Sequence, residues 1–151
     1  MIALTDKPFD PGALLTAFCK GRTETGAVAT FTGLARAEQG ATATLELEAY
    51  PGFTESEIGR IAAGARERFG LDDFSIVHRV GRIAPGEAIV FVATAAGHRR
   101  AAFEACDFLM DYLKSRAPFW KKETGPDGAA RWIEPRPQDH ADIARWEETP
   151  K

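Results

Sequence analysis

Three consecutive basic residues, His98, Arg99 and Arg100, follow the most apolar run of the chain and open its longest amphipathic segment. If that segment is a helix, its free backbone N–H groups and the positive end of its dipole would attract a phosphate or a carboxylate. Cations are unfavourable in the first turn of an isolated helix, so this placement favours an anion-binding role. The alternative is that His98 caps the helix and that both arginines are merely solvated.

Two lysines, Lys114 and Lys121, lie on either side of a segment that contains Pro118, Phe119 and Trp120. A lysine that is desolvated, or close to another cation, has a lowered pKa and can act as a nucleophile or as a general acid or base. Lys114 also falls in the last turn of the predicted helix, where any cation complements the dipole. Because the chain turns at Pro118, the spacing alone leaves open whether the two ammonium groups meet.

Arg36 follows a predicted strand that ends at Gly33, a reasonable place for an anion clamp, although a solvated surface arginine is an equal alternative. His78 falls inside a predicted strand, which favours a packed, hydrogen-bonded histidine. The histidines at positions 78, 98 and 140 match no zinc spacing, and the chain has no P-loop, GxGxxG or GxSxG motif. The sequence therefore predicts neither a metal site nor a nucleotide-binding loop.

Hydrophobic periodicity predicts the elements that must position these side chains. Helices are predicted from an Asp10-Pro11 start to Gly21, from a capping box at residues 54–57 to Gly70, and over residues 99–116. Strands are predicted over residues 25–31, 42–49, 74–80 and 88–95, with a hairpin of residues 119–123 and 131–134. Residues 34–41 are predicted to form a loop. With no repeat or linker, residues 1–151 are predicted to form one α+β domain.

Composition narrows the class of protein. The 151 residues are 44% hydrophobic and 27% charged, as in ordinary globular domains, and the net charge is −3. Residues 98–122 nevertheless carry six Lys or Arg against three Asp or Glu, which indicates a local anion site and not a nucleic-acid-coating surface. The longest uncharged stretch has eleven residues, too few for a membrane span, and the N-terminus does not resemble a secretory signal. Cys19 and Cys106 are expected to be reduced in a cytoplasmic protein.

Four segments carry unusual motifs: residues 30–36 (TFTGLAR), 78–81 (HRVG), 97–99 (GHR) and 110–123 (MDYLKSRAPFWKKE). In this order, from the first predicted strand to about Arg136, they resemble the large, catalytic subunit of molybdopterin synthase. Gly97 and Phe53 stand where Ala or Ser and Met are common in that family, and neither is a charged position. The resemblance implies an α/β hammerhead fold with an additional antiparallel β subdomain. It also implies a homodimer flanked by two small ubiquitin-like sulfur-carrier subunits, together a heterotetramer.

The same resemblance implies an activity, the conversion of cyclic pyranopterin monophosphate (precursor Z) to molybdopterin. The sulfur would come from the thiocarboxylated C-terminal Gly-Gly tail of the carrier, with no metal or cofactor in this step and no nucleic-acid or membrane partner. Lys114 and Lys121 match the two lysines regarded as catalytic in the family. The positions that match its substrate-binding residues are Arg36, His98, Arg99, Lys122, Glu123 and Arg136.

Two other classes of function stay open at this stage. A non-catalytic module that binds a pterin or the carrier tail would need the anion pocket but not the two lysines. A hydrolase or phosphotransferase would use His98 as a general base, but it would also need a partner carboxylate or a metal, and no motif supplies one. Separate assays of binding and of product formation would distinguish these classes.

Overall fold

The computed structural model describes residues 1–37, 44–125, 128, 130–133 and 136–147. Twelve elements follow one another along these residues. In chain order they are β1 (Ile2–Thr5), α1 (Pro11–Cys19), β2 (Ala27–Leu34), β3 (Thr44–Ala49), α2 (Phe53–Phe69), β4 (Asp73–Arg79), β5 (Gly81–Ile83), β6 (Ala88–Ala96), α3 (Arg99–Ser115), β7 (Phe119–Thr124), β8 (Ala130–Ile133) and α4 (Pro137–Glu147). The mixture of helices with two sheets confirms the predicted α+β class.

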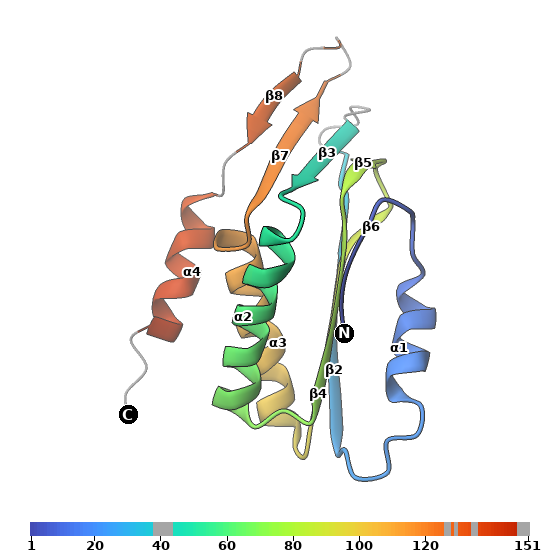
Figure 1. The fold of residues 1–151 in the computed structure, drawn as a ribbon, viewed down its shortest axis with the longest axis vertical. Helices are drawn as coiled ribbons and strands as arrows, with labels where there is room; N and C mark the ends of the chain where they lie inside the picture. The colour runs from blue at the N-terminus through green and yellow to red at the C-terminus, as the bar shows by residue number, and fades with distance from the viewer. Residues whose placement is uncertain (38–43, 126–127, 129, 134–135, 148–151) are drawn as a thin grey trace.

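The larger sheet has the strand order β1-β4-β6-β2, with β1 parallel to β4 and the other pairs antiparallel. Helix α1 covers one face of this sheet, and α2 and α3 cover the other (Figure 1). Helix α4 packs against α3, on the side away from the sheet (Figure 1). Strand β2 is an edge strand, paired only with β6 among the described strands.

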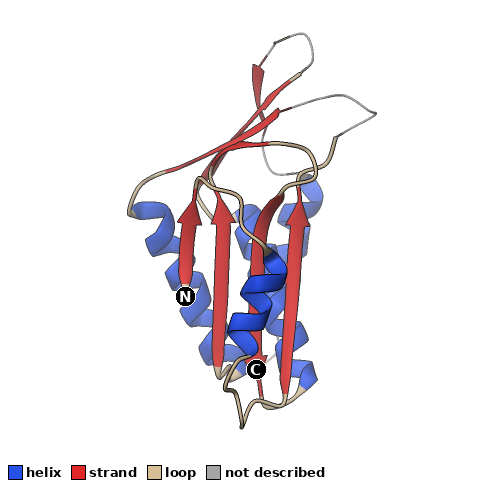
Figure 2. Ribbon diagram, turned by 90° about the vertical axis from the view of Figure 1, so that its right-hand side faces the viewer, coloured by secondary structure: helices blue, strands red, loops and turns tan. Residues whose placement is uncertain are grey.

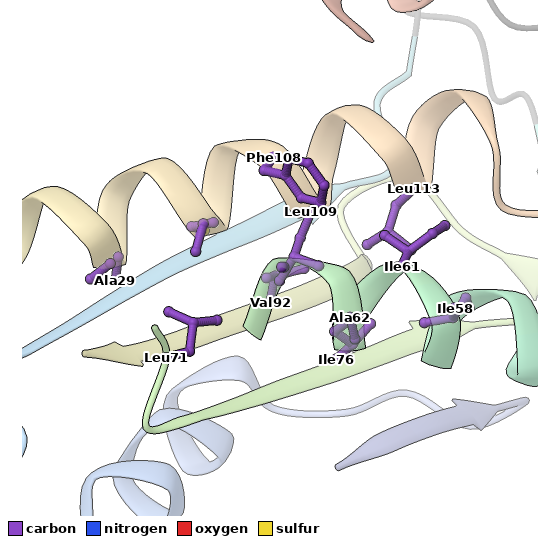
Figure 3. Packing of buried hydrophobic residues seen from close by; sticks show 14 of the residues in the cluster. Ala29, Ile58, Ile61, Ala62, Leu71, Ile76, Val92, Phe108, Leu109 and Leu113 are labelled. Atoms are coloured by element: carbon purple, nitrogen blue, oxygen red, sulfur yellow. The ribbon is translucent and has the colours of Figure 1, made fainter. Parts of the chain in front are cut away.

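The main core lies between this sheet and the pair of helices α2 and α3 (Figure 3). Ile58, Ile76, Val92 and Leu109 are fully buried there, because apolar residues at helical spacing meet alternate residues of the strands. Burying each such side chain contributes about 1.5–3 kcal/mol. This rigid layer fixes the two ends of α3 relative to the strands.

The smaller sheet has the order β5-β3-β7-β8, is antiparallel throughout and projects beyond one end of the larger sheet (Figure 2). Among the described residues, a small buried cluster of Ala35, Leu47 and Ile83 anchors it. The predicted hairpin is confirmed as β7 and β8, although Glu134 and residues 126, 127 and 129 lie outside the described residues. Residues 38–43 of the predicted loop and strand lie outside them as well.

Local start and stop signals explain most element bounds. The Asp10 side chain caps α1 by accepting a hydrogen bond from the Gly12 N–H at 2.9 Å, and Gly70 ends α2 in the left-handed conformation. The predicted capping box at residues 54–57 is wrong. Helix α2 already begins at Phe53, and the buried Thr54 hydroxyl accepts from the Tyr50 N–H and donates to the Pro118 carbonyl, both at 2.8 Å.

Three elements were not predicted, namely β1, β5 and α4. The apolar stripe predicted for α3 also needs one correction. Ala102, Cys106, Leu109 and Leu113 are buried, but Phe103 is 61% exposed, because the buried stripe runs through Ala105 and Phe108 instead. No helix within the described residues is long and apolar enough to span a membrane.

Candidate functional site

Lys114 is placed by the last turn of α3, just before the helix ends at Ser115. The helix stops because Pro118 cannot continue it, and the Arg116 N–H closes the end on the Tyr112 carbonyl at 2.7 Å. Leu113 beside it is buried in the main core, so the helix backbone at Lys114 is held firmly while the lysine side chain stays exposed.

Lys121 is placed by β7, the strand that follows this turn. In the antiparallel register, Lys121 is opposite Leu47, the buried anchor of the smaller sheet. Directly opposed residues share a face of a sheet and alternate residues return to it, so Lys121 shares its face with Phe119 and Glu123. Phe119 packs against the main core, which ties the start of β7 to the larger sheet.

The structure brings the two lysines together. Partial desolvation lowers the pKa of Lys114, and the positive charges of Lys121 and then of Arg136 lower it further, while the Asp139 carboxylate acts in the opposite direction. Because the side chain remains in contact with water, the size of this effect is limited. The two ammonium groups therefore lie within electrostatic range of each other.

Arg136 and Asp139 approach Lys114 from the first turn of α4. The Ser115 hydroxyl donates a hydrogen bond to the Asp139 carbonyl at 2.7 Å, so α4 is attached to the residue next to Lys114. Further along, Arg145 forms ion pairs with Asp107 at 2.8 Å and with Asp111 at 2.6 Å on α3. The predicted residue Arg136 thus lies on the same side of the molecule as Lys114.

His78 also belongs to this neighbourhood, although the sequence suggested only a packed histidine. It is 8% exposed, stacks on Phe119 with ring centroids 4.1 Å apart, and its Nδ1 lies 2.8 Å from the Arg79 carbonyl oxygen. Since a carbonyl only accepts, Nδ1 carries the proton in this contact. Burial lowers the pKa of His78 to about 4, the Lys114 charge adds to this, and the Arg79 carbonyl opposes it. A neutral imidazole therefore lies beside the lysine pair.

Arg36 follows the end of β2, where the larger sheet meets the smaller one. The preceding residue, Ala35, is buried against Leu47, and its N–H donates to the Glu87 carbonyl at 2.8 Å. The predicted strand end and the following arginine are therefore fixed next to the smaller sheet, on which Lys121 lies.

His98 and Arg99 lie elsewhere. His98 is the N-cap residue of α3 but makes no capping hydrogen bond with its side chain, and both residues are exposed. Helix α3 has 17 residues, so at 1.5 Å per residue about 24 Å separates them from Lys114. Within one chain, the structure does not unite these two predicted residues with Lys114, Lys121, Arg36 and Arg136.

Lys122 and Glu123 divide between the two faces of the smaller sheet. Glu123 shares the face of Lys121, whereas Lys122 faces the other way, with its Nζ 5.7 Å from the centroid of the Trp132 ring.

On the face of the smaller sheet that carries Lys122, Glu48, Trp120 and Trp132 line an open hollow of about 340 Å³. The exposed tryptophans were not predicted as a surface feature, although an apolar aromatic pair beside lysines was visible in the sequence.

Comparison with known proteins gives consistent matches over nearly the whole chain. The MoaE protein family matches residues 4–116. The molybdopterin synthase catalytic subunit of Caulobacter vibrioides is 71% identical over 148 residues, covering 98% of this chain and 98% of that protein.

Solved structures of similar proteins agree with these sequence matches. A molybdopterin biosynthesis MoaE protein from Burkholderia ambifaria has a TM-score of 0.84 at 47% identity, covering 99% of both chains. The crystal structure of molybdopterin synthase from Staphylococcus aureus has a TM-score of 0.77 at 30% identity, covering 86% of this chain and 94% of that chain. On these matches, the chain belongs to the MoaE protein family.

Proposed function

We propose that this chain is the catalytic subunit of a molybdopterin synthase, which converts cyclic pyranopterin monophosphate to molybdopterin. The sulfur would be delivered by the thiocarboxylated C-terminus of a small ubiquitin-like carrier subunit. The observation that carries the proposal is the electrostatic coupling of Lys114 to Lys121 at the junction of the two sheets, with Arg136 close by. Family membership supports the same activity.

The proposed site suits its reactants because both are anions. Arg36, with His98 and Arg99, would hold the substrate and its phosphate, since arginine offers a fixed fork of donors. Lys121 and Lys114 would position the thiocarboxylate and move protons as sulfur attacks and the cyclic phosphate opens.

Glu123 and Arg136 would line the same pocket as the lysine pair. Strand alternation directs Lys122 to the opposite face of the sheet, so the mechanism assigns it no contact with the reacting atoms. The carrier would approach as a separate subunit. A cytoplasmic location fits the two unpaired cysteines, Cys19 and Cys106.

A second copy of the chain would complete the site. Among the described strands, β2 has one unpaired edge, and its residues Thr30, Phe31, Thr32 and Leu34 are exposed. If two copies paired antiparallel through this edge about Phe31, Arg36 of one copy would lie opposite Gly26 of the other. In each chain, Gly26 packs so closely on Gly97 that a side chain there would collide with the Gly97 carbonyl. This pairing would therefore bring His98 and Arg99 of the second copy to Arg36.

Reconstitution tests the proposed activity. The purified protein, a thiocarboxylated carrier and cyclic pyranopterin monophosphate are mixed, and molybdopterin is assayed. We expect product only when all three are present, and a loss of product with retained substrate binding for Lys114→Ala and for Lys121→Ala. Unchanged product from these variants would contradict catalysis by the lysines. Phosphate release from generic esters without the carrier would favour a hydrolase instead.

A mixed dimer tests the shared site. Lys121→Ala and Arg99→Ala inactivate different halves of the proposed pocket, so each variant alone should be inactive. After random re-association of equal amounts, half of the dimers are mixed, and each of these has one intact site. We expect recovery of about a quarter of the wild-type rate, because a symmetric dimer has two identical sites and only the mixed dimers have one of them intact. No recovery, with mixed dimers present by native mass spectrometry, would show that each pocket is built within one chain.

A further inference from the structure

Arg79, in the HRVG segment, is a buried cation that the proposed function does not use. Its side chain is 3% exposed, although it ends β4 where the chain passes from the larger sheet to the smaller one. Nη2 donates to the Arg82 carbonyl of β5 at 2.8 Å, whereas Nε and Nη1 make no hydrogen bond within the described part of the chain. Nη1 lies 3.6 Å from a carboxylate oxygen of Glu87. Because a buried charge is costly without a counter-charge, Arg79 depends on Glu87.

Glu87 uses its two carboxylate oxygens for two different contacts. Oε2 faces Arg79, and Oε1 accepts the Ala84 N–H at 2.7 Å. The Glu87 N–H also donates to the Ala84 carbonyl at 3.1 Å, so side chain and backbone together close the turn of residues 84–87 between β5 and β6. The ion pair therefore ties this turn to the end of β4.

The same turn holds the residue before Arg36 through two hydrogen bonds. The Ala35 N–H donates to the Glu87 carbonyl at 2.8 Å, and the Gly86 N–H donates to the Ala35 carbonyl at 2.7 Å. The pairing of β2 with β6 shifts register just before this point, so the turn continues the support where the regular ladder is interrupted. The direction in which the backbone presents Arg36 therefore depends on the turn.

We propose that Arg79 and Glu87 are positioning residues for anion binding: their ion pair holds the turn of residues 84–87, and the turn fixes the backbone that presents Arg36. This rests on the proposed function for the role of Arg36, but not for the effect on the backbone at Ala35. The HRVG segment then serves the anion site from a distance, without touching the substrate.

One variant separates positioning from a simple effect of charge. If the pair acted only through its electric field, removing the negative charge of Glu87 would strengthen the binding of an anion. If the pair positions Arg36, the same change weakens binding, because the buried guanidinium loses its counter-charge and the turn loosens. Glu87→Gln keeps an oxygen that can accept the Ala84 N–H, so it removes the charge with little change in shape.

The first test measures the backbone without any turnover. Hydrogen exchange of single amides is followed by NMR in the full-length protein, with the Asp72 amide as reference, because it donates to the Ala95 carbonyl at 2.8 Å at the far end of β4. In Glu87→Gln, the Ala35 and Gly86 amides should exchange about tenfold faster, with the reference unchanged. Unchanged exchange at both amides would overturn the proposal, and so would an equal rise at all three, which would show general destabilisation.

Matched variants separate this pair from ion pairs in general. Glu57→Gln on α2 removes a carboxylate that is 27% exposed, against 32% for Glu87, and that pairs with Arg60 at 2.9 Å. It should leave exchange at Ala35 unchanged. In an Arg79→Met background, Glu87→Gln should add little further exchange, because the pair is already broken. Fully additive effects would overturn the proposal. If Arg79→Met does not fold, Glu87→Gln and the Glu57→Gln control still decide.

The second test uses the reconstituted synthase. Glu87→Gln should raise KM for the anionic substrate several-fold and leave kcat close to wild type, because the pair acts on binding and not on the lysines. In an Arg36→Ala background the same change should leave KM unaltered, since no side chain is left to position. A lowered KM, or a lowered kcat with an unmoved KM, would overturn the proposal. If wild-type protein makes no molybdopterin but exchange at Ala35 still rises in Glu87→Gln, the proposed function fails and the effect on the backbone stands.

Discussion

Basic residues lie at both ends of α3, but the two ends differ in their surroundings and in the sign of the helix dipole. At the N-terminus, His98, Arg99 and Arg100 are exposed, face the unfavourable end of the dipole and have no capping hydrogen bond from His98. At the C-terminus, Lys114 lies at the favourable end of the dipole among Lys121, Arg136 and Asp139. One end offers fixed charge to a partner, and the other holds amines whose protonation responds to their neighbours.

The proposed function assigns binding to the first of these ends and proton transfer to the second. Arginine keeps its charge at any ordinary pH, whereas the proton affinity of a lysine is easily changed by its surroundings. The separation of about 24 Å along the helix means that the two kinds of group can act on one substrate only if they come from different copies.

The largest expected effect concerns the proton-transfer end. Lys121→Arg keeps the positive charge but replaces the amine with a guanidinium group that does not give up its proton. We therefore expect turnover to fall by about 100-fold with substrate binding largely retained. The matched change at the other end, Arg99→Lys, should mainly raise KM. Steady-state kinetics of dithiolene formation measure both. Near-normal turnover in Lys121→Arg would remove the proton-transfer role and with it the contrast between the two ends.

A smaller effect concerns the neutral imidazole beside the lysine pair. The pKa of His78 is about 4 in the folded protein and near 6.5 when unfolded, so the unfolded chain binds more protons between these values. Stability is therefore full above pH 6.5 and falls as the pH decreases toward 4, by about 2 kcal/mol at pH 5.

His78→Phe keeps an aromatic ring against Phe119 but cannot titrate. Urea unfolding of both proteins near pH 7 and pH 5 should show a smaller loss of stability in the variant. The lowered pKa of Asp73 gives a slope of the same sign in both proteins, so the difference between them isolates His78. Parallel slopes in the two proteins would contradict a depressed pKa at His78.

The smallest effect concerns the binding end. The backbone of His98 is extended, as suits an N-cap, but its side chain makes no cap bond. His98→Asp should therefore raise the free energy of unfolding by about 1 kcal/mol while it lowers activity. His98→Ala is the control, with the same functional loss and no stabilisation. A variant that is more stable and fully active would show that His98 is not used for binding.

Local signals in the sequence predicted much of the fold. Asp10 with Pro11, Gly70 and Pro118 mark element ends through short-range chemistry, and the structure follows them. The capping box at Thr54 failed because the hydroxyl finds a partner 64 residues away, at Pro118, which no local pattern reveals. Helix α4 was missed because its apolar contacts are few and widely spaced: Ile143 is buried, and Trp146 packs against Phe69 and Phe108 of the main core. Ion pairs of Arg145 with Asp107 and Asp111 add to this attachment.

The site was predicted less completely than the fold. Lys114 and Lys121 were paired through the family resemblance and not by their spacing, and the structure places them within electrostatic range. The distance of His98 from them could not be foreseen, because helical periodicity says which face is buried but not which ends of different elements meet. The approach of α4 to Lys114 carried no motif, since it comes only from the docking of α4 on α3.

The buried hydroxyl of Thr54 joins the start of α2 to the residue just before β7. The inner ends of β3 and β7, the two central strands of the smaller sheet, are therefore held together at one junction with the helical layer. Substitutions far from this junction, toward the outer ends of β3 and β7, should therefore leave the base that bears Lys121 undisturbed.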